Sequence, residues 1–298
     1  MLDNYHNTIA ITGASGLLGR HLCDMYRRKG WRVNALVRDI SKYPFMEKGI
    51  NVYKCDLPDT MDLKSIENAV ILIHCAYMTR FTSKEDAKRA NEEGMLKVYK
   101  AAQNAGVKKF VFISSRAAHP DAKSYYAQSK YRLESMLDMS RDLIIRPGLI
   151  LASDGGLFSR IVNLVQRLPV IPVFGRGDQK IKTVHIDDLC NAIERALEDR
   201  LCGVISVSEM EDITMKDLLK LVLSQVERKK LLISVPGTPF ILLLQFMELI
   251  GLKLPVSSEN LRGLLSTGSK DLKSINNYVP IGMHIRSTQE SIKHLISK

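Results

Sequence analysis

The sequence lacks the cysteine pattern of a disulfide framework. Five cysteines are scattered through 298 residues with no C-x-x-C pair, at positions 23, 55, 75, 190 and 202. An odd, dispersed set is typical of reduced thiols in an intracellular protein. The first eight residues are polar and contain no apolar segment of the kind that a signal peptide needs. We therefore expect a cytoplasmic protein.

Long apolar runs are also missing. The most apolar stretch, Phe240–Leu252, contains Gln245, Glu248 and Gly251 and is too short to span a bilayer. We expect a core or cap helix at this stretch. The basic run at 228–230 lies nearby, so weak peripheral association with a membrane surface is the alternative.

Aromatic residues make up only 6% of the chain, and its basic clusters are not interleaved with aromatic side chains that stack bases. The net charge of +11 therefore predicts a surface that favours anionic ligands, and no nucleic-acid partner is expected. The seven histidines form no metal-ligand spacing with cysteines or carboxylates, so no metal is expected.

What the first half does contain is an alternation of short β-rich runs with amphipathic helical stretches. The predicted strands are Thr8–Thr12, Arg32–Val37, Asn51–Lys54, Val70–Cys75, Phe110–Ser114 and Leu143–Arg146, and later Val204–Val207. The predicted helices follow the first strand and span Lys84–Asn104, Tyr125–Leu137, Asp188–Asp199 and Thr214–Val226. This order is typical of βαβ units and a parallel sheet.

Beyond Pro147 the alternation loosens, and Gly, Pro and Asp cluster in Ser153–Gly156 and Pro169–Asp178. We expect an α/β fold with a doubly wound parallel sheet of the Rossmann type and a smaller, mostly helical C-terminal substrate lobe. The predicted nucleotide-binding domain spans residues 1–150 and is completed by about 180–208. Residues 151–179 and 209–298 are predicted to form the substrate or cap lobe.

A glycine-rich loop follows the first predicted strand, with Gly13, Gly16 and Gly19 in G-x-x-G-x-x-G spacing. Gly13 suits a tight turn, Gly16 lets a pyrophosphate approach the backbone, and Gly19 permits close packing of helix on strand. The N-terminus of the next helix offers N–H groups and a partial positive charge to phosphates. The loop therefore predicts a dinucleotide site, and we include Ser15 and Leu17 among its contacts.

The end of the second strand bears on the choice of dinucleotide. Arg38 directly follows the strand, where a guanidinium can bind a 2′-phosphate in bidentate fashion, which favours NADP. Asp39 is the competing residue, because a carboxylate there can accept from a ribose hydroxyl and favour NAD.

Tyr126 and Lys130 lie four residues apart and share one face of a predicted helix. A neighbouring ammonium favours the phenolate and brings a tyrosine towards the range useful for acid–base catalysis. Ser115, or Ser114 before it, ends the fifth strand at the sheet edge where α/β proteins bind ligands. We expect Ser115 to hold a substrate oxygen and His119, in the following loop, to line the substrate cleft.

Taken together, these residues resemble the extended or atypical short-chain dehydrogenases/reductases, the NAD-dependent epimerase/dehydratase-like superfamily. Further stretches are similar in order, from Ile9 to Val207: Asp56-Leu57, Ile73-His74-Cys75-Ala76, Asn91 with Gly94, Arg146-Pro147-Gly148 and Val184-His185-Ile186-Asp187-Asp188. The resemblance implies cofactor contacts from Asp56, Leu57, Cys75, Ala76 and Pro147. It also implies an NAD(P)-dependent oxidoreductase or epimerase acting on a hydroxyl or carbonyl carbon of a small molecule, which could be a nucleotide-sugar or related metabolite. Homodimers formed through helices are common among the proteins that the chain resembles, and the sequence leaves the oligomeric state open.

Two departures leave an alternative open. Ser115 and Tyr126 are closer in sequence than the sugar-nucleotide epimerases usually show, and Gln179–Thr183 lacks the arginine with which those enzymes bind the substrate diphosphate. Lys180 or Lys182 could replace it only as a point charge. The alternative is a non-catalytic NADP(H)-binding scaffold, similar to the nucleotide-binding subunit associated with respiratory complex I.

Overall fold

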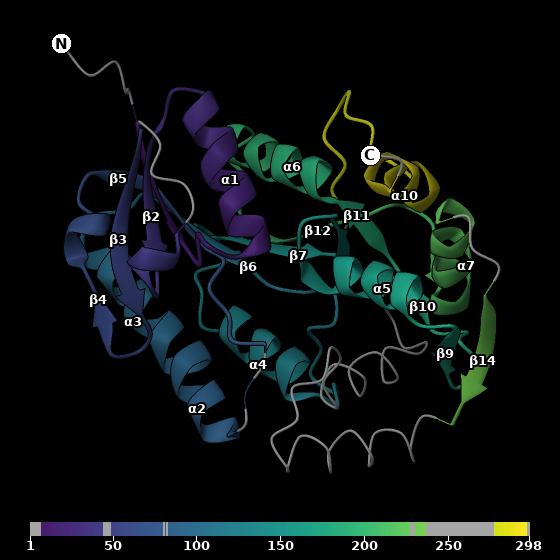
Figure 1. Cartoon of the computed structure of the whole chain (residues 1–298). Coiled ribbons are helices and arrows are strands. Elements are labelled where there is room, and N and C mark those ends of the chain that lie inside the picture. The colour runs from purple at the N-terminus through teal and green to yellow at the C-terminus, as the bar shows by residue number, and fades with distance from the viewer. Residues whose placement is uncertain are drawn as a thin grey trace. The chain divides into compact units, whose positions relative to one another are not determined.

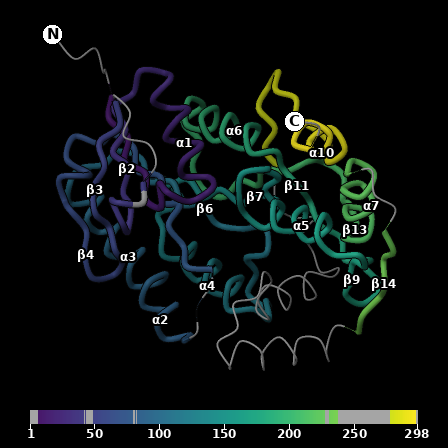
Figure 2. The backbone as a smooth tube through the Cα atoms, in the orientation of Figure 1, coloured from purple at the N-terminus to yellow at the C-terminus, as the bar shows by residue number. Residues whose placement is uncertain are grey.

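The computed structural model describes residues 7–43, 49–79, 81, 83–226, 230–236 and 277–296. The segment Phe240–Leu252 lies outside the described residues. In the part that is described, no helix is both long and apolar enough to cross a membrane. The chain divides into two compact units, the first made of Met1–Ser114, Arg132–Ile145 and Ala196–Val204, the second of Ser115–Tyr131, Arg146–Arg195 and Ile205–Lys298 (Figures 1 and 2).

The first unit is built around an eight-stranded sheet. Its strands are β1 (Thr8–Thr12), β2 (Arg32–Val37), β3 (Ile50–Asp56), β4 (Thr60–Met61), β5 (Ala69–His74), β6 (Lys109–Ile113), β7 (Leu143–Pro147) and β12 (Gly203–Val207). Their spatial order is β12-β7-β6-β5-β1-β2-β3-β4. Neighbours from β3 to β7 pair in parallel, and the short β4 is antiparallel to β3. The predicted doubly wound parallel sheet is confirmed.

The strand order reverses at β1. From β1 the chain proceeds outwards through β2 and β3 on one side, and β5, β6 and β7 extend from it on the other side. In open α/β sheets, ligands bind outside the carboxyl ends of the strands at such a switch point. The residues that follow β1 and β5, Gly13 and Cys75, therefore stand at the place where a nucleotide is expected.

Helices flank this sheet. The first, α1 (Leu17–Arg28), packs on β1 and β2, and Gly30 beyond it has a φ of +78°, as expected for a helix that ends at glycine. After β5 come α2 (Lys84–Lys88), a π-helical turn (Arg89–Glu93, η3) and α3 (Gly94–Asn104), which together form the predicted helix Lys84–Asn104. Short 3₁₀ turns occupy Ile40–Lys42 (η1) and Leu63–Ser65 (η2).

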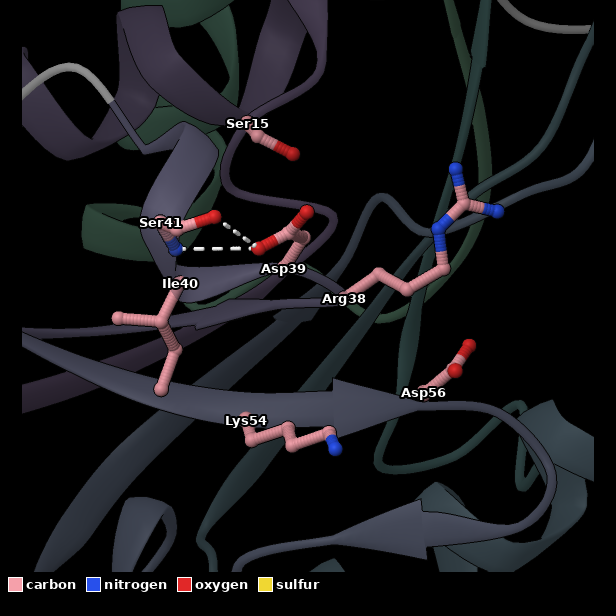
Figure 3. A pocket seen from close by; sticks show the side chains of 7 residues that line it. All are labelled: Ser15, Arg38, Asp39, Ile40, Ser41, Lys54 and Asp56. Atoms are coloured by element: carbon pink, nitrogen blue, oxygen red, sulfur yellow. Dashed lines mark hydrogen bonds between the residues drawn. The ribbon is translucent and has the colours of Figure 1, made fainter.

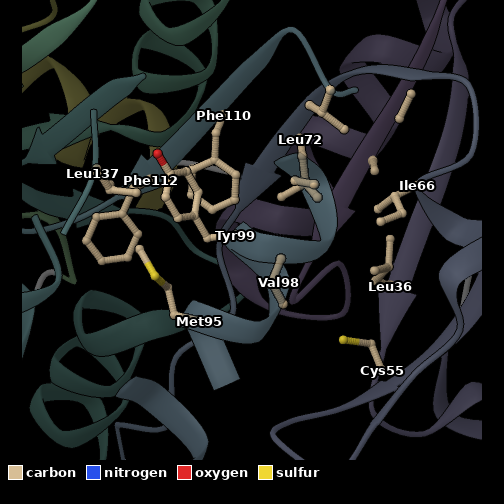
Figure 4. Close-up of a cluster of buried hydrophobic side chains, with 14 of the residues drawn as sticks. Leu36, Cys55, Ile66, Leu72, Met95, Val98, Tyr99, Phe110, Phe112 and Leu137 are labelled. Carbon is tan, nitrogen blue, oxygen red and sulfur yellow. The ribbon is translucent and has the colours of Figure 1, made fainter. Parts of the chain in front are cut away.

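One apolar core lies between the sheet and α3. Met95, Val98 and Tyr99 of α3 contact strand residues that include Leu72 and Phe112, and all of these side chains are buried (Figure 4). The helical spacing of the first three and the alternation along the strands bring the apolar faces together. Burial of this kind stabilises the sheet whose edge carries the glycine loop.

The second unit combines helices with two-stranded sheets. Its strands are β8 (Leu149–Leu151), β9 (Val170–Phe174), β10 (Lys180–Ile181), β11 (Thr183–His185), β13 (Ile213–Thr214) and β14 (Leu231–Val235). They pair as β8 with β11, β9 with β14 and β10 with β13. The helices are α5 (Gly156–Arg167), α7 (Met215–Gln225) and α10 (Thr288–Ile296), together with most of α4 (Tyr125–Glu134) and of α6 (Ile186–Glu198).

The sequence predictions for this half are partly wrong. Strand β9 lies within Pro169–Asp178, where glycine, proline and aspartate cluster and no strand was predicted, and α4 ends at Glu134 rather than at Leu137. The prediction for α7 is confirmed, since Thr214 is its N-cap and accepts a hydrogen bond from the Asp217 N–H at 3.1 Å.

Candidate functional site

The glycine loop connects β1 to α1 through closely packed backbone. Gly13 has a φ of +66°, and a Cβ on it would lie 2.7 Å from the Ala76 nitrogen. A Cβ on Gly19 would lie 2.3 Å from the Gly13 carbonyl oxygen. Real Cβ atoms do not come so close, so these two positions require glycine. The loop thus brings the end of β1 and the residues after β5 together.

The N-terminus of α1 is available to an anion. Gly16 is its N-cap, no side chain caps the helix, and the first turn holds no acidic residue. The N–H groups of a first helical turn have no acceptor within the helix. Together with the helix dipole, they favour binding of a phosphate.

Thr12 ties the same two strand ends together. Its Oγ1 lies 2.9 Å from His74 Nδ1 and accepts from the Ala76 N–H at 3.3 Å. His74 is 2% exposed and its ring stacks near Phe110 and Phe112. We infer that His74 is a structural residue of the core.

A pocket of about 550 Å³ opens beside the ends of β2 and β3. Seven residues line it, namely Ser15, Arg38, Asp39, Ile40, Ser41, Lys54 and Asp56 (Figure 3). Arg38 is exposed and, among the described residues, its side chain makes no hydrogen bond or ion pair. Asp39 is the N-cap of η1 and accepts from the Ser41 N–H at 3.1 Å and from the Ser41 hydroxyl at 2.6 Å.

Asp56 is the last residue of β3, and Leu57 follows it. Asp56 is exposed and lines the pocket. Leu57 instead packs against the helix that follows β5, so closely that a Cβ added to Gly94 would lie 2.7 Å from Leu57 Cβ.

Asn91 holds the segment after β5, because its amide accepts from the Met78 N–H at 2.6 Å and donates to the Met78 oxygen at 3.0 Å.

The hydroxyls of Ser114 and Ser115 have different hydrogen-bond partners. The Ser114 hydroxyl is buried and donates to the Glu134 carboxylate. The Ser115 hydroxyl accepts from the Ala117 N–H at 3.2 Å and also hydrogen-bonds the side chain of Tyr126. Of the two serines, Ser115 is therefore the one whose hydroxyl meets the tyrosine.

Tyr126 and Lys130 lie one turn apart on α4, with Lys130 almost fully buried. Burial raises the pKa of Tyr126 above its ordinary value, and the hydrogen bond with Ser115 acts in the opposite direction. Tyr126 is accordingly a neutral phenol at pH 7, in the form that can donate a proton.

His119 lies four residues after Ser115, and Pro147 is the last residue of β7. His119 is half-buried, and its Nδ1 accepts from the Asp121 N–H at 3.1 Å. Pro147 is buried at the end of β7, and its carbonyl oxygen accepts from the Arg116 N–H at 3.3 Å.

Lys180 and Lys182, the possible replacements for the diphosphate-binding arginine, differ in their contacts. Lys182 donates to the carbonyl oxygens of Glu209 and Met210 and lies 3.5 Å from Asp212 Oδ1. Its ammonium is therefore committed within the second unit. Lys180 is exposed on β10.

Sequence reasoning missed Lys54 and Ser41. Lys54 ends the predicted strand Asn51–Lys54, and only the pairing of β3 with β2 shows that it borders the pocket. Within the described part of the chain, no group of histidines, cysteines and carboxylates could hold a metal ion.

Comparisons with known proteins agree with this geometry. Residues 9–142 match the family model of the NAD dependent epimerase/dehydratase family. A ceramide reductase of Caulobacter vibrioides is 29% identical over 215 residues, 70% of this chain and 67% of that protein. A dihydroflavonol 4-reductase of Hordeum vulgare is 23% identical over 268 residues, 74% of this chain and 75% of that protein.

A similar fold occurs in the UDP-glucuronic acid 4-epimerase from Bacillus cereus, solved in complex with NAD. Its TM-score is 0.67 at 17% identity, over 77% of this chain and 87% of that one. The sheet order, the glycine loop at the switch point and the match of residues 9–142 lead to one conclusion: this part of the chain is similar to the NAD dependent epimerase/dehydratase family, and the protein is an NAD(P)-dependent oxidoreductase or epimerase.

Proposed function

We propose that this protein is an NADP(H)-dependent reductase that interconverts a carbonyl and a hydroxyl on a small molecule, with Tyr126, Ser115 and Lys130 as its catalytic residues. The observation that carries the proposal is the placement of Tyr126 one helical turn before the buried Lys130 on α4. Ser115 acts on the same phenol, since hydrogen bonding with Ser115 opposes the rise of the Tyr126 pKa on burial, so both side chains can contact one substrate oxygen.

In the direction of reduction, Tyr126 donates its proton to the carbonyl oxygen as the hydride reaches the carbonyl carbon. The nicotinamide, when bound, supplies that hydride and with it both electrons. Because burial raises the pKa of Tyr126, the residue starts in the protonated form that this step requires. Ser115 holds the substrate oxygen, and the tyrosinate that remains is reprotonated before the next turnover.

Lys130 is proposed to act on Tyr126 and on the cofactor. A lysine one helical turn after a tyrosine lies on the same face, and its positive charge stabilises the phenolate that forms after proton transfer. Its ammonium is also suited to donate to the hydroxyls of the nicotinamide ribose.

Three cofactor contacts follow from the first unit. The glycine loop and the N-terminus of α1 suit the pyrophosphate. The exposed guanidinium of Arg38 suits an adenosine 2′-phosphate, while Asp39 is engaged by Ser41. These contacts favour NADP(H) over NAD(H).

The contacts of Lys182 bear on whether the substrate contains a diphosphate. Its ammonium is bound by two carbonyl oxygens and lies beside Asp212, so it is not available to a substrate diphosphate. Together with the missing arginine, this favours a substrate without a nucleotide, as the names of the ceramide and dihydroflavonol reductases also suggest.

The test is steady-state turnover of NADPH against a panel of ketones and their alcohols, for the wild type and Tyr126→Phe. We expect Tyr126→Phe to lower kcat by about 10²- to 10⁴-fold, while calorimetry gives the same Kd for NADPH. Tyr131→Phe, an exposed tyrosine on the same helix, is the matched control and should retain turnover.

Other results of this experiment would point to other functions. Full turnover by Tyr126→Phe would contradict the catalytic assignment. Substrate conversion without net consumption of NADPH would indicate epimerisation. Tight NADPH binding without turnover of any substrate would favour the scaffold. Arg38→Ala tests the cofactor choice, and we expect it to weaken NADPH binding more than NADH binding.

A further inference from the structure

The pocket beside β2 and β3 contains a second cation besides Arg38. Lys54 lies on β3 and is the parallel-sheet partner of Val37, the residue that immediately precedes Arg38. Both cations line the same pocket, although they come from different strands. The register between β2 and β3 brings Arg38 and Lys54 to the same pocket, because Val37 at the end of β2 lies beside Lys54.

Neither cation has another partner among the described residues. In the described ranges of the chain, the side chains of Arg38 and Lys54 make no hydrogen bond or ion pair, and both are exposed. In Figure 3 they extend away from the Asp39–Ser41 pair, on the side of the pocket where Asp56 lies. Long cationic side chains without a partner can close on a ligand without breaking an existing contact.

The charges of the pocket favour an anion. On the side of the two cations the pocket contains one carboxylate, Asp56, which leaves a net positive charge there. The other carboxylate, Asp39, is directed to the Ser41 N–H and hydroxyl, which bind its negative charge. A phosphate monoester carries nearly two negative charges at pH 7 and is matched better by two cations than by one.

We propose that Lys54 is a specificity-determining residue of this site, which together with Arg38 binds the 2′-phosphate of an adenosine 2′-phosphate group. This inference rests on the proposed function, because it assumes that the adenosine of NADP(H) enters this pocket. Arg38 supplies a planar, bidentate donor, and Lys54 supplies a mobile point charge from the neighbouring strand. Discrimination against a ribose 2′-hydroxyl then depends on both strands.

The experiment compares two fragments that differ only in where the second phosphate is attached. Calorimetric titrations with 2′,5′-ADP and with 5′-ADP are made on the wild type, Lys54→Met, Lys54→Arg and Arg38→Met. Lys64→Met, which removes an exposed lysine of the same unit from outside the pocket, is the matched control. The ratio of the two dissociation constants isolates the 2′-phosphate from the rest of the nucleotide.

We expect the wild type to bind 2′,5′-ADP more tightly than 5′-ADP. Lys54→Met should weaken 2′,5′-ADP binding by up to about fivefold, as the loss of one exposed charge pair predicts, and leave 5′-ADP binding unchanged. Lys54→Arg should restore most of the preference, and Lys64→Met should behave as the wild type.

Two results would overturn the inference. A preference for 2′,5′-ADP that is undiminished in Lys54→Met would show that Lys54 does not contact the phosphate. An equal loss for both fragments would show a general effect on the pocket. If Arg38→Met loses the preference for 2′,5′-ADP over 5′-ADP, either of these results leaves the proposed NADP(H) dependence intact. A wild type that binds the two fragments equally well would contradict the NADP(H) dependence itself.

Discussion

Gly13 and Ala76 are in such close backbone contact that a Cβ on Gly13 would lie 2.7 Å from the Ala76 nitrogen. Gly13 also has a φ of +66°, so substitution carries a conformational cost as well. Gly106 separates these effects, since it has a φ of +73° and nothing lies within 4 Å of its Cβ position.

We therefore predict that Gly106→Ala lowers the free energy of unfolding by about 1 kcal/mol, the cost of the left-handed conformation alone. Gly13→Ala should cost about 3 kcal/mol, because steric overlap with the Ala76 backbone adds to it. Urea denaturation measures both. Equal losses for the two variants would show that the contact between β1 and the residues after β5 is unimportant for stability.

A second prediction concerns the buried hydrogen bond from the Tyr99 hydroxyl to Asp142 Oδ2, at 2.5 Å. Asp142 is fully buried and also accepts from the Asp138 N–H and from Arg141. Tyr99→Phe keeps the edge-to-face packing on Phe110 but removes one donor. We expect a loss of about 1–3 kcal/mol in the free energy of unfolding.

The pH dependence of this loss has a defined sign. Burial and the hydrogen bond to Asp142 raise the pKa of Tyr99, so its stabilising effect is present below the unfolded-state pKa of about 10 and is lost as the pH rises through the folded-state value. The difference between the wild type and Tyr99→Phe should shrink above about pH 10. Tyr131→Phe, which alters an exposed tyrosine, should show neither effect.

The parts of the fold that the sequence predicted well are those with local signals. Strands β1 and β2 begin and end where predicted, because each is an apolar run bounded by turn residues, and the glycine loop marks the first crossover. Strand β9 was not predicted. It contains Pro172 and pairs with β14, some sixty positions away in sequence, so nothing local indicated it.

The candidate site shows the same division. The sequence alone identified Gly13 and Arg38 from their places after strands, but it left Ser114 and Ser115 as alternatives. Only the side-chain contacts separate the two serines, since Ser114 bonds Glu134 and Ser115 bonds Tyr126. Lys54 was missed because its position depends on the register between two strands.

A third prediction concerns the thiols. Burial raises the pKa of Cys23 and of Cys55 to about 12, so at pH 8 about one molecule in ten thousand carries either thiolate. Cys202 is exposed and should react first with a disulfide reagent, as peptide mapping after brief labelling would show. In denaturant all five thiols should react. Stoichiometric labelling of Cys23 or Cys55 in the folded protein would contradict the structure.

The last prediction concerns acid. His185 is 1% exposed, and its Nδ1 accepts from Arg286 at 2.8 Å and from the Asp187 N–H at 3.2 Å, while its Nε2 lies 3.2 Å from His294 Nδ1. Burial and the positive charge of Arg286 lower the pKa of His185, although the carboxylates of Asp187 and Asp188 oppose this. Protonation would also cost the two hydrogen bonds that Nδ1 accepts.

A histidine whose folded-state pKa is depressed contributes stability above its unfolded-state pKa, and that stability is lost as the pH falls through the folded-state value. The free energy of unfolding of the wild type should therefore fall below about pH 6.5, by up to about 1.4 kcal/mol per pH unit relative to His185→Gln. His284→Gln, which removes an exposed histidine, should keep the wild-type slope. Because His294 belongs to α10, hydrogen exchange in α10 should increase in acid before exchange in the sheet does, and equal slopes for the wild type and His185→Gln would contradict this role.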